Sequence, residues 1–340
     1  MTALISAAAL LLALLIDRWL GEPPARLHPV VWIGRYLGWA GRRLQRITQP
    51  LGCTDIKAFW LAAFYWCVGA AIVAGVFWAL QMQIVDTFLL FDATVMVQPD
   101  ESALTVALRF FLQLLAVLLM ALLLKPLLAW AMLKSEVRSV ESALGQSLDA
   151  GRERLSWLVS RDVSALSEAQ VRESAIESLA ENLNDSVVAP IFWFVLLGLP
   201  GAALYRFANT ADAMWGYRGV YKDQNWEWAG KWAARADDVL SWLPARLTAL
   251  LLVLASRARW RAVCREAAKT PSPNSGWPMA TMALALDIRL GKPGVYVLNP
   301  TGRQPTRTDT ARAVMYAETV TVVVVCVALP ALVLRSMVVS

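Results

Sequence analysis

Long apolar runs separated by charged segments constrain this chain more than any other feature. Residues 58–80 and 313–334 are each long enough to cross a bilayer, which takes about 20 residues, and a return span is expected between residues 103 and 133. Of the 340 residues, 58% are hydrophobic and 17% are charged, and the mean hydropathy is +0.49, which is too apolar for a soluble domain of this length. The sequence therefore predicts an all-α polytopic integral membrane protein, with about four to six membrane segments in one embedded domain over residues 1–340.

The distribution of charge predicts a topology. Arginine and lysine are retained in cytoplasmic loops, which also explains the net charge of +6 without a nucleic-acid partner. Residues 81–101 hold four acids and no lysine or arginine, so we expect this loop outside the cytoplasm. Arg109 and Lys125 bracket the most apolar part of the return span, where both can snorkel to opposite interfaces. We expect four cytoplasmic, largely helical loops, at residues 17–57, 134–186, 208–238 and 257–312.

The segment 187–207 is too short and too interrupted for an ordinary span. Its apolar half, 187–197, is broken by Gly198, Leu199, Pro200 and Gly201 before the chain turns back. A re-entrant hairpin would keep the following basic residues in the cytoplasm, whereas a full crossing would place them outside. The sequence does not decide between these alternatives. It also does not decide whether residues 239–256 cross the membrane. Broken backbone at membrane depth is tolerated where it lines a cavity or is buried in protein, so the hairpin is itself a candidate site.

Four carboxylates recur at every fourth residue just before this segment: Glu173, Glu177, Glu181 and Asp185. On a helix they form one stripe, and like charges at this spacing cost roughly 0.2–0.5 kcal/mol per pair. The arrangement therefore needs a compensating cation, a partner arginine or plain water, and each alternative implies a different role.

Three further polar features are candidate sites. His28 is the only histidine; it can titrate near neutrality or contact phosphate, although a lone histidine is more often structural. Asp237 and Asp238 can bind Mg²⁺ or cap a helix, and the sequence does not decide between these roles. The loop 270–278 precedes a helix expected at 279–290, and small and amide residues there offer backbone N–H groups to a phosphate.

Several of these blocks occur together, in order, in one family. The residues that carry the resemblance are Asp17, Gly21 to Pro23, His28 to Val30, Glu173 to Asn182, Asp185, Ala189 to Trp193, Gly198 to Gly201, Tyr205, Asn209, Thr210, Asp212, Met214, Gly216, Tyr217, Asp237, Asp238, Pro244 to Leu247, Ser272 to Asn274, Gly291 and Tyr296. With them the chain resembles the cobinamide-phosphate synthase family of cobalamin biosynthesis (CobD/CbiB type) over nearly its whole length. Ala213 stands where a serine is familiar in that family, so this chain has no hydroxyl at that position.

The resemblance implies an enzyme of the cell inner membrane with its active site facing the cytoplasm. It implies ATP-dependent amide ligation of adenosylcobyric acid with (R)-1-amino-2-propanol or its O-phosphate, giving adenosylcobinamide or its phosphate. ATP is then a co-substrate with Mg²⁺, no tightly bound cofactor is expected, and the other expected partners are the lipid bilayer and other cobalamin-assembly enzymes. No Gly-rich phosphate loop of the Gly-x-x-x-x-Gly-Lys-Ser/Thr kind is present.

Roles for individual residues follow from fitting that chemistry to the sequence. The catalytic candidates, which include a base for the amine proton, are His28, Glu177, Glu181 and Asp185. The candidates for binding substrate or phosphate are Asn182, Asn209, Tyr217, Arg246, Lys269 and Asn274. The candidates for holding Mg²⁺ are Glu177, Asp185, Asp212, Asp237 and Asp238.

Two other classes of function stay in competition. A non-catalytic membrane partner or signalling protein would not need the individual acids of the stripe. A transporter would also combine broken helices with acids, but it would bury ionisable groups near mid-span, whereas these carboxylates cluster in predicted loops.

Overall fold

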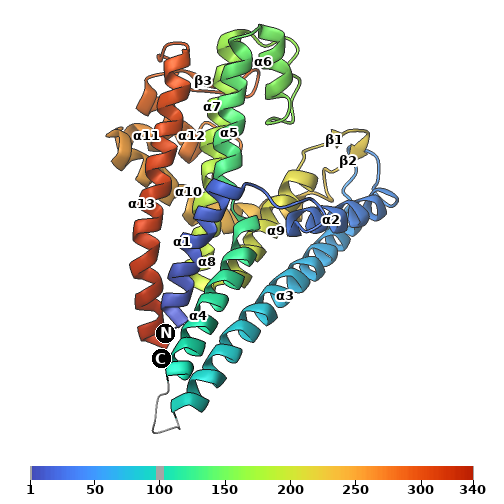
Figure 1. Ribbon diagram of the computed structural model, residues 1–340. Coiled ribbons are helices and arrows are strands. Elements are labelled where there is room, and N and C mark those ends of the chain that lie inside the picture. The colour runs from blue at the N-terminus through green and yellow to red at the C-terminus, as the bar shows by residue number, and fades with distance from the viewer. Residues whose placement is uncertain (1, 97–102, 340) are drawn as a thin grey trace. The chain divides into compact units, whose positions relative to one another are not determined.

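The computed structural model describes residues 2–96 and 103–339, and within them it is built almost entirely of helices (Figure 1). The prediction of an all-α polytopic membrane protein is confirmed. In the described residues four helical stretches are long and apolar enough to cross a membrane: Ile56–Leu89, Ala103–Leu144, Lys231–Ser256 and Arg307–Arg335. The chain divides into two compact units, and the expectation of a single embedded domain stays a prediction.

Unit 1 comprises Met1–Leu128, Pro190–Asp237 and Val327–Ser340. Its elements are α1 (Thr2–Leu20), α2 (Pro29–Gln45), α3 (Ile56–Met96), α4 (Ala103–Leu124), the 3₁₀ turn η1 (Lys125–Leu127), α8 (Ala189–Leu197), α9 (Leu199–Trp215) and the antiparallel hairpin of β1 (Val220–Tyr221) and β2 (Gln224–Asn225).

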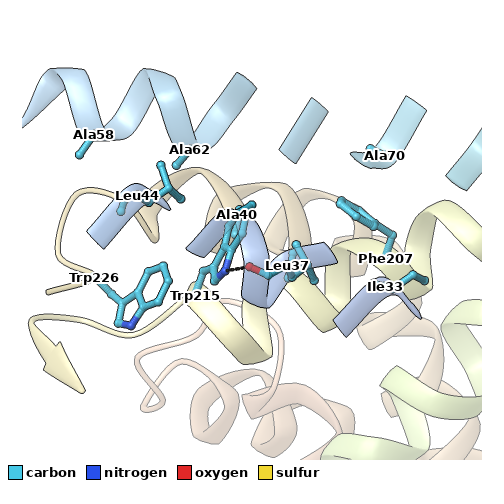
Figure 2. Close-up of a cluster of buried hydrophobic side chains, with 13 residues drawn as sticks. Ile33, Leu37, Ala40, Leu44, Ala58, Ala62, Ala70, Phe207, Trp215 and Trp226 are labelled. Carbon is cyan, nitrogen blue, oxygen red and sulfur yellow. Dashed lines mark hydrogen bonds between the residues drawn. The ribbon is translucent and has the colours of Figure 1, made fainter. Parts of the chain in front are cut away.

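The core of unit 1 lies where α2, α3 and α9 meet (Figure 2). One face of α2 is buried, with Ile33 and Leu37 packed against small residues of α3 such as Ala70. Trp215 of α9 is 1% exposed, and its indole Nε1 donates to the backbone oxygen of Leu37 at 3.3 Å. The buried indole thus satisfies its donor while it fills the core.

Two helices of unit 1 end where the sequence did not predict. Residues 81–96 continue α3, because this stretch holds neither glycine nor proline, so the prediction that the loop begins at 81 is wrong; its end, 97–102, lies outside the described residues. The return span lies within the expected range 103–133, and its helix stops at Leu124, since Pro126 has no N–H to continue the helical hydrogen bonds. Lys125 does not snorkel to an interface: it is 3% exposed and ion-paired.

The predicted break at residues 198–201 is present between α8 and α9. Gly198 has φ +74, and an added Cβ would collide with the amide of Gln81. That amide accepts a hydrogen bond from the backbone N–H of Leu199 at 2.7 Å, which satisfies a donor at the start of α9. Re-entry of the two helices into a bilayer stays a prediction.

Unit 2 comprises Ala129–Ala189 and Asp238–Cys326. Its elements are α5 (Trp130–Leu144), α6 (Leu148–Leu155), α7 (Glu168–Leu183), the π-helical turn η2 (Asn184–Val188), most of α10 (Lys231–Ser256), α11 (Trp260–Ala267), α12 (Gly276–Leu286), the antiparallel hairpin of β3 (Leu290–Lys292) and β4 (Tyr296–Leu298), and most of α13 (Arg307–Val339).

A polar link joins three helices of unit 2. The guanidinium of Arg172 on α7 forms a two-pronged ion pair with Glu141 on α5, with N···O distances of 2.9–3.0 Å. The same carboxylate accepts a hydrogen bond from Thr310 of α13 at 2.7 Å. Paired hydrogen bonds between arginine and a carboxylate fix orientation as well as distance, so α7 is held in a defined rotation.

Two predictions for unit 2 need correction. The helix expected at 279–290 runs from Gly276 to Leu286 and ends where Asp287 adopts a left-handed conformation with φ +52. Asp237 and Asp238 lie inside the continuous helix α10, so the interpretation of this pair as an N-terminal cap is wrong. A single crossing by α10 would put residues 208–238 and 257–312 on opposite sides, and the side on which each lies stays a prediction.

Candidate functional site

Helix α7 carries the first two carboxylates of the stripe into the interior of unit 2. A capping box of Ser167 and Gln170 starts the helix, and the apolar side chains on its other faces are buried. Glu173 is 3% exposed and Glu177 is 4% exposed. The stripe therefore does not begin as a solvated surface, which excludes plain water as the partner of these two residues.

Arginines from outside α7 compensate the buried carboxylates. Nη2 of Arg161 lies 3.0 Å from Oε2 of Glu177 and also donates to the hydroxyl of Ser174. Nη2 of Arg289 lies 3.4 Å from Oε1 of Glu173. Of the three alternatives that the sequence left open, the structure has the partner arginine at both positions.

Burial nevertheless dominates the electrostatics of this cluster. Desolvation raises the pKa of Glu177 above its ordinary value, although the charge and hydrogen bond of Arg161 act in the opposite direction. Desolvation also raises the pKa of Glu173, with the charge of Glu177 adding to it and Arg289 opposing it. Both carboxyl groups therefore hold a proton more readily than exposed glutamates.

Tyr296 of β4 completes the cluster. Burial and the neighbouring charges of Glu177 and Glu181 raise the pKa of its phenol, so the hydroxyl keeps its proton. The hydroxyl lies beside Glu177 but is directed at Sδ of Met279, at 3.7 Å. Among the described residues, Oε1 of Glu177 is buried and has no hydrogen bond of standard geometry, so this oxygen is enclosed in the cluster beside the phenol of Tyr296.

The stripe emerges from the interior at its C-terminal end. Glu181, Asn182 and Asp185 are half-buried. The amide of Asn182 donates to the backbone oxygen of Ser178 at 2.9 Å, which keeps it on the helix surface. Asp185 lies in the π-helical turn η2, a local distortion that frequently occurs at functional sites.

The turn η2 is fixed by its own polar contacts. The amide nitrogen of Asn184 donates to Asp185 at 2.8 Å, and its amide oxygen accepts from the hydroxyl of Thr248 at 3.1 Å. Asp185 is therefore positioned by a buried neighbour.

Asn274 connects the loop before α12 to α10. Its side-chain nitrogen donates to the backbone oxygen of Asp238 at 2.7 Å, and its side-chain oxygen accepts from Nη1 of Arg246 at 3.1 Å. The Arg246 guanidinium also lies over the rings of Trp242 and Trp277, at 4.2 and 4.8 Å from their centroids. Three of the residues predicted as sites, Asp238, Arg246 and Asn274, thus lie together.

Two phosphate contacts that the sequence suggested are otherwise engaged. The backbone N–H groups of Asn274 and Ser275 both donate to the hydroxyl of Ser272 at 3.2 Å, so they are not free for a phosphate. Lys269 pairs with Glu266 at 2.7 Å.

In unit 1, His28 lies at the start of α2. Its Nδ1 accepts the backbone N–H of Val30 at 3.3 Å, which makes it the N-cap, and its Nε2 lies 3.1 Å from Oε2 of Glu22. The neutral ring that matches these contacts carries its proton on Nε2 and donates it to Glu22, so neither nitrogen is open to accept a proton from a substrate. This arrangement favours the structural interpretation of His28.

The remaining candidates also belong to unit 1. Asn209, Asp212 and Asp237 are half-buried on helices, and Tyr217 stacks on Tyr221 with ring centroids 3.7 Å apart. A site that they share with α7 stays a prediction.

A magnesium ion that is bound with a nucleotide would need fewer protein ligands than a metal cage made only of protein. In the described ranges 2–96 and 103–339, no group of three or more His, Cys, Asp or Glu side chains could hold a metal ion. Mg²⁺ that arrives with ATP takes one or two carboxylates beside phosphate oxygens and water. The half-buried Asp185 is a carboxylate of that kind, whereas Glu177 is enclosed, and its role as a magnesium ligand stays a prediction.

Sequence reasoning missed the cations of these clusters. Arg161 and Arg289 lie in segments without periodicity, 16 and 116 positions away from the glutamates they pair with, so no spacing rule pointed to them. Glu22 and Lys125 were likewise not singled out as partners.

Membrane-length helices and a buried carboxylate–arginine cluster define the class as a polytopic membrane protein with a polar site. The CobD/Cbib protein family model matches residues 10–326, and the chain belongs to the CobD/CbiB family. It is 37% identical over 299 residues to a probable cobalamin biosynthesis protein CobD of Methanothermobacter thermautotrophicus, covering 86% of each chain. It is 39% identical to the corresponding Thermococcus kodakarensis protein, covering 89% of this chain and 88% of that one, and 38% identical to cobalamin biosynthesis protein CobD of Chromobacterium violaceum, covering 91% of each. No solved structure matches the chain.

Proposed function

We propose that this protein catalyses an amide ligation in cobalamin biosynthesis, driven by ATP, on the cytoplasmic side of the inner membrane. The substrates are adenosylcobyric acid and (R)-1-amino-2-propanol or its O-phosphate. The observation that carries the proposal is the buried pair Glu173 and Glu177 on α7, opposed by Arg161 and Arg289, in a chain of this family.

A carboxylate is a poor electrophile, so the proposed reaction has two steps. A propionate oxygen of the corrinoid attacks the γ-phosphorus of ATP, ADP leaves, and an acyl phosphate forms. The amine nitrogen then attacks the acyl carbon, inorganic phosphate leaves, and the nitrogen gives up one proton. Mg²⁺ bound with ATP would neutralise charge on the transferring phosphoryl group.

Glu177 is the proposed acceptor of the amine proton. A general base works best when its pKa approaches the working pH, and burial moves the pKa of Glu177 in that direction. Its Oε2 is held by Arg161 at 3.0 Å, whereas its buried Oε1 has no hydrogen bond of standard geometry among the described residues. The arginine therefore orients the carboxyl group and leaves one oxygen for chemistry.

Arg289 is the proposed anchor for an anionic substrate group. Its side chain is 41% exposed and uses one nitrogen, at 3.4 Å, on Glu173, which leaves further N–H donors. A guanidinium group with free N–H donors binds phosphate and carboxylate groups through paired hydrogen bonds. Arg246, stacked between two tryptophans, is a second candidate for the same duty.

The test is a mass-spectrometric product assay on purified protein in nanodiscs, with adenosylcobyric acid, Mg-ATP and each amine form. Glu177→Gln is compared with Glu168→Gln, which removes a 57% exposed carboxylate from the first turn of the same helix. Product that requires ATP, is lost in Glu177→Gln and is retained in Glu168→Gln supports the proposal.

Other outcomes separate its parts. If Glu177→Gln still forms product, the protein is a ligase but Glu177 is not its catalytic base. If folded wild-type protein forms no product with either amine, the protein is better assigned as a non-catalytic membrane partner.

A further inference from the structure

The exposed face of α2 carries alternating aromatic and basic side chains. They recur at intervals of three or four residues, so they lie on one side of the helix, opposite the buried Ile33, Leu37 and Leu44. We call this face the α2 stripe; its members are Trp32, Arg35, Trp39, Arg42, Arg43 and Arg46. Tryptophan is enriched at membrane–water interfaces, and clusters of arginine there attract anionic lipid headgroups.

The charge of the stripe is not neutralised by the chain. Within the described residues no acidic side chain pairs with its four arginines, and Arg43 lies over the ring of Trp39 at 4.2 Å. Four adjacent positive charges on 12 residues attract anions.

An apolar cavity of about 360 Å³ adjoins the stripe in unit 1. Its walls come from α2, α3 and α4 with Phe207 of α9, and Trp32 belongs both to the cavity wall and to the stripe. Several wall residues are about half exposed, among them Trp32 (51%), Ile72 (56%) and Val76 (50%), so the cavity opens to the outside.

The chemistry of the two features identifies one occupant. More of the cavity wall comes from α3 than from any other helix, and α3 is long and apolar enough to cross a membrane, so we infer that the mouth of the cavity faces lipid. The ligand must be apolar where it enters the cavity and negatively charged one helical turn away, beside Arg35. We propose that unit 1 binds one phospholipid with an anionic headgroup, its acyl chain in the cavity and its phosphate on the arginines of the α2 stripe.

The test is native mass spectrometry of the full-length protein, delipidated in detergent and titrated with dioleoyl phosphatidylglycerol or dioleoyl phosphatidylcholine. The two lipids share their acyl chains and differ in headgroup charge. We expect one retained adduct with a clear preference for phosphatidylglycerol. In Arg35→Ala/Arg42→Ala/Arg43→Ala that preference should fall by about fivefold per arginine at low salt.

Two further variants separate the parts of the site. Val76→Trp fills the cavity and should lower retention of both lipids, whereas Val106→Trp, at an exposed position of α4 outside the cavity wall, should leave retention unchanged. Arg259→Ala/Arg261→Ala/Arg265→Ala removes the same charge from exposed positions around α11 and should preserve the preference.

Circular dichroism and thermal unfolding must show that each variant is folded. Equal retention of the two lipids by the wild type overturns the proposal, as does an equal loss in the α11 variant, which would indicate diffuse attraction. Displacement of the lipid by millimolar inorganic phosphate would also contradict it, because the acyl chain would then contribute nothing.

Discussion

Nζ of Lys125 lies 2.7 Å from Oε2 of Glu22, and the same carboxylate oxygen lies 3.1 Å from Nε2 of His28. Only 3% of the lysine side chain is exposed, and Asp17, which is 1% exposed, lies 3.5 Å away. One oxygen of Glu22 thus connects the turn after α4 to the start of α2. The cluster explains how a lysine is tolerated next to one of the most apolar helices of the chain.

Lys125→Met should lower the free energy of unfolding by about 3–5 kcal/mol, because it removes the cation beside the buried Asp17 and the half-buried Glu22. Thermal unfolding in detergent measures the loss. Lys134→Met is the control: it breaks a pair with Glu318 at 2.6 Å, but that pair is partly exposed and should cost at most about 1 kcal/mol. Lys125→Met combined with Asp17→Asn and Glu22→Gln should recover much of the loss; equal costs for the two lysines would contradict the buried-pair interpretation.

The contribution of Glu22 to stability should depend on pH. Burial raises its pKa, but hydrogen bonds and charge from His28 and Lys125 outweigh burial, so the pKa lies below its ordinary value of 4.5. A carboxyl group whose pKa is lowered by folding stabilises the protein above the ordinary value and loses that contribution as pH falls through the lowered value. The stability advantage of wild type over Glu22→Gln should therefore be constant above about pH 5 and shrink below it; an advantage that grows on acidification would refute this sign.

The general architecture could be predicted because it depends on local signals. Apolar length predicted the membrane helices, and Gly198 and Pro200 predicted the break between α8 and α9. The four-residue spacing predicted that Glu173 and Glu177 lie on one face of a helix. It also predicted that these like charges need a compensating partner.

The partners themselves could not be predicted, because they depend on long-range packing. Nothing local distinguishes Arg161, which pairs with Glu177, from the many arginines that lie on the surface. Lys125 was expected at an interface because a lone lysine beside an apolar helix usually snorkels, and tertiary burial beside Glu22 overrode that tendency. Residues 81–96 were assigned to a loop because the expected apolar span ends at residue 80, whereas the helix continues beyond it.

Gly69 and Gly75, both on α3, should respond to alanine in opposite directions. A Cβ on Gly69 would lie closer than 3 Å to the rings of Tyr36 and Phe207, so Gly69→Ala should destabilise by about 1–3 kcal/mol through overpacking. A Cβ on Gly75 meets nothing within 4 Å, so Gly75→Ala should stabilise by up to about 1 kcal/mol, since alanine is the better helix former. Thermal unfolding of the two variants side by side gives the comparison, and the same sign for both would show that α2 and α9 do not pack on α3 as described.

Glu177 should make the protein less stable as pH rises. Desolvation raises its pKa in the folded state above the ordinary value of 4.5, despite Arg161, so between the two values the folded chain binds more protons than the unfolded chain. The free energy of unfolding must then fall as pH rises through that window. Glu177→Gln cannot titrate and should remove this part of the slope, whereas Glu168→Gln, exposed on the same helix, should keep it. Unfolding curves of the three proteins between about pH 4 and pH 8 measure the slopes; a wild-type slope equal to that of Glu177→Gln would mean that Arg161 fully compensates the buried charge, and Glu177 would then be a poor candidate for the base.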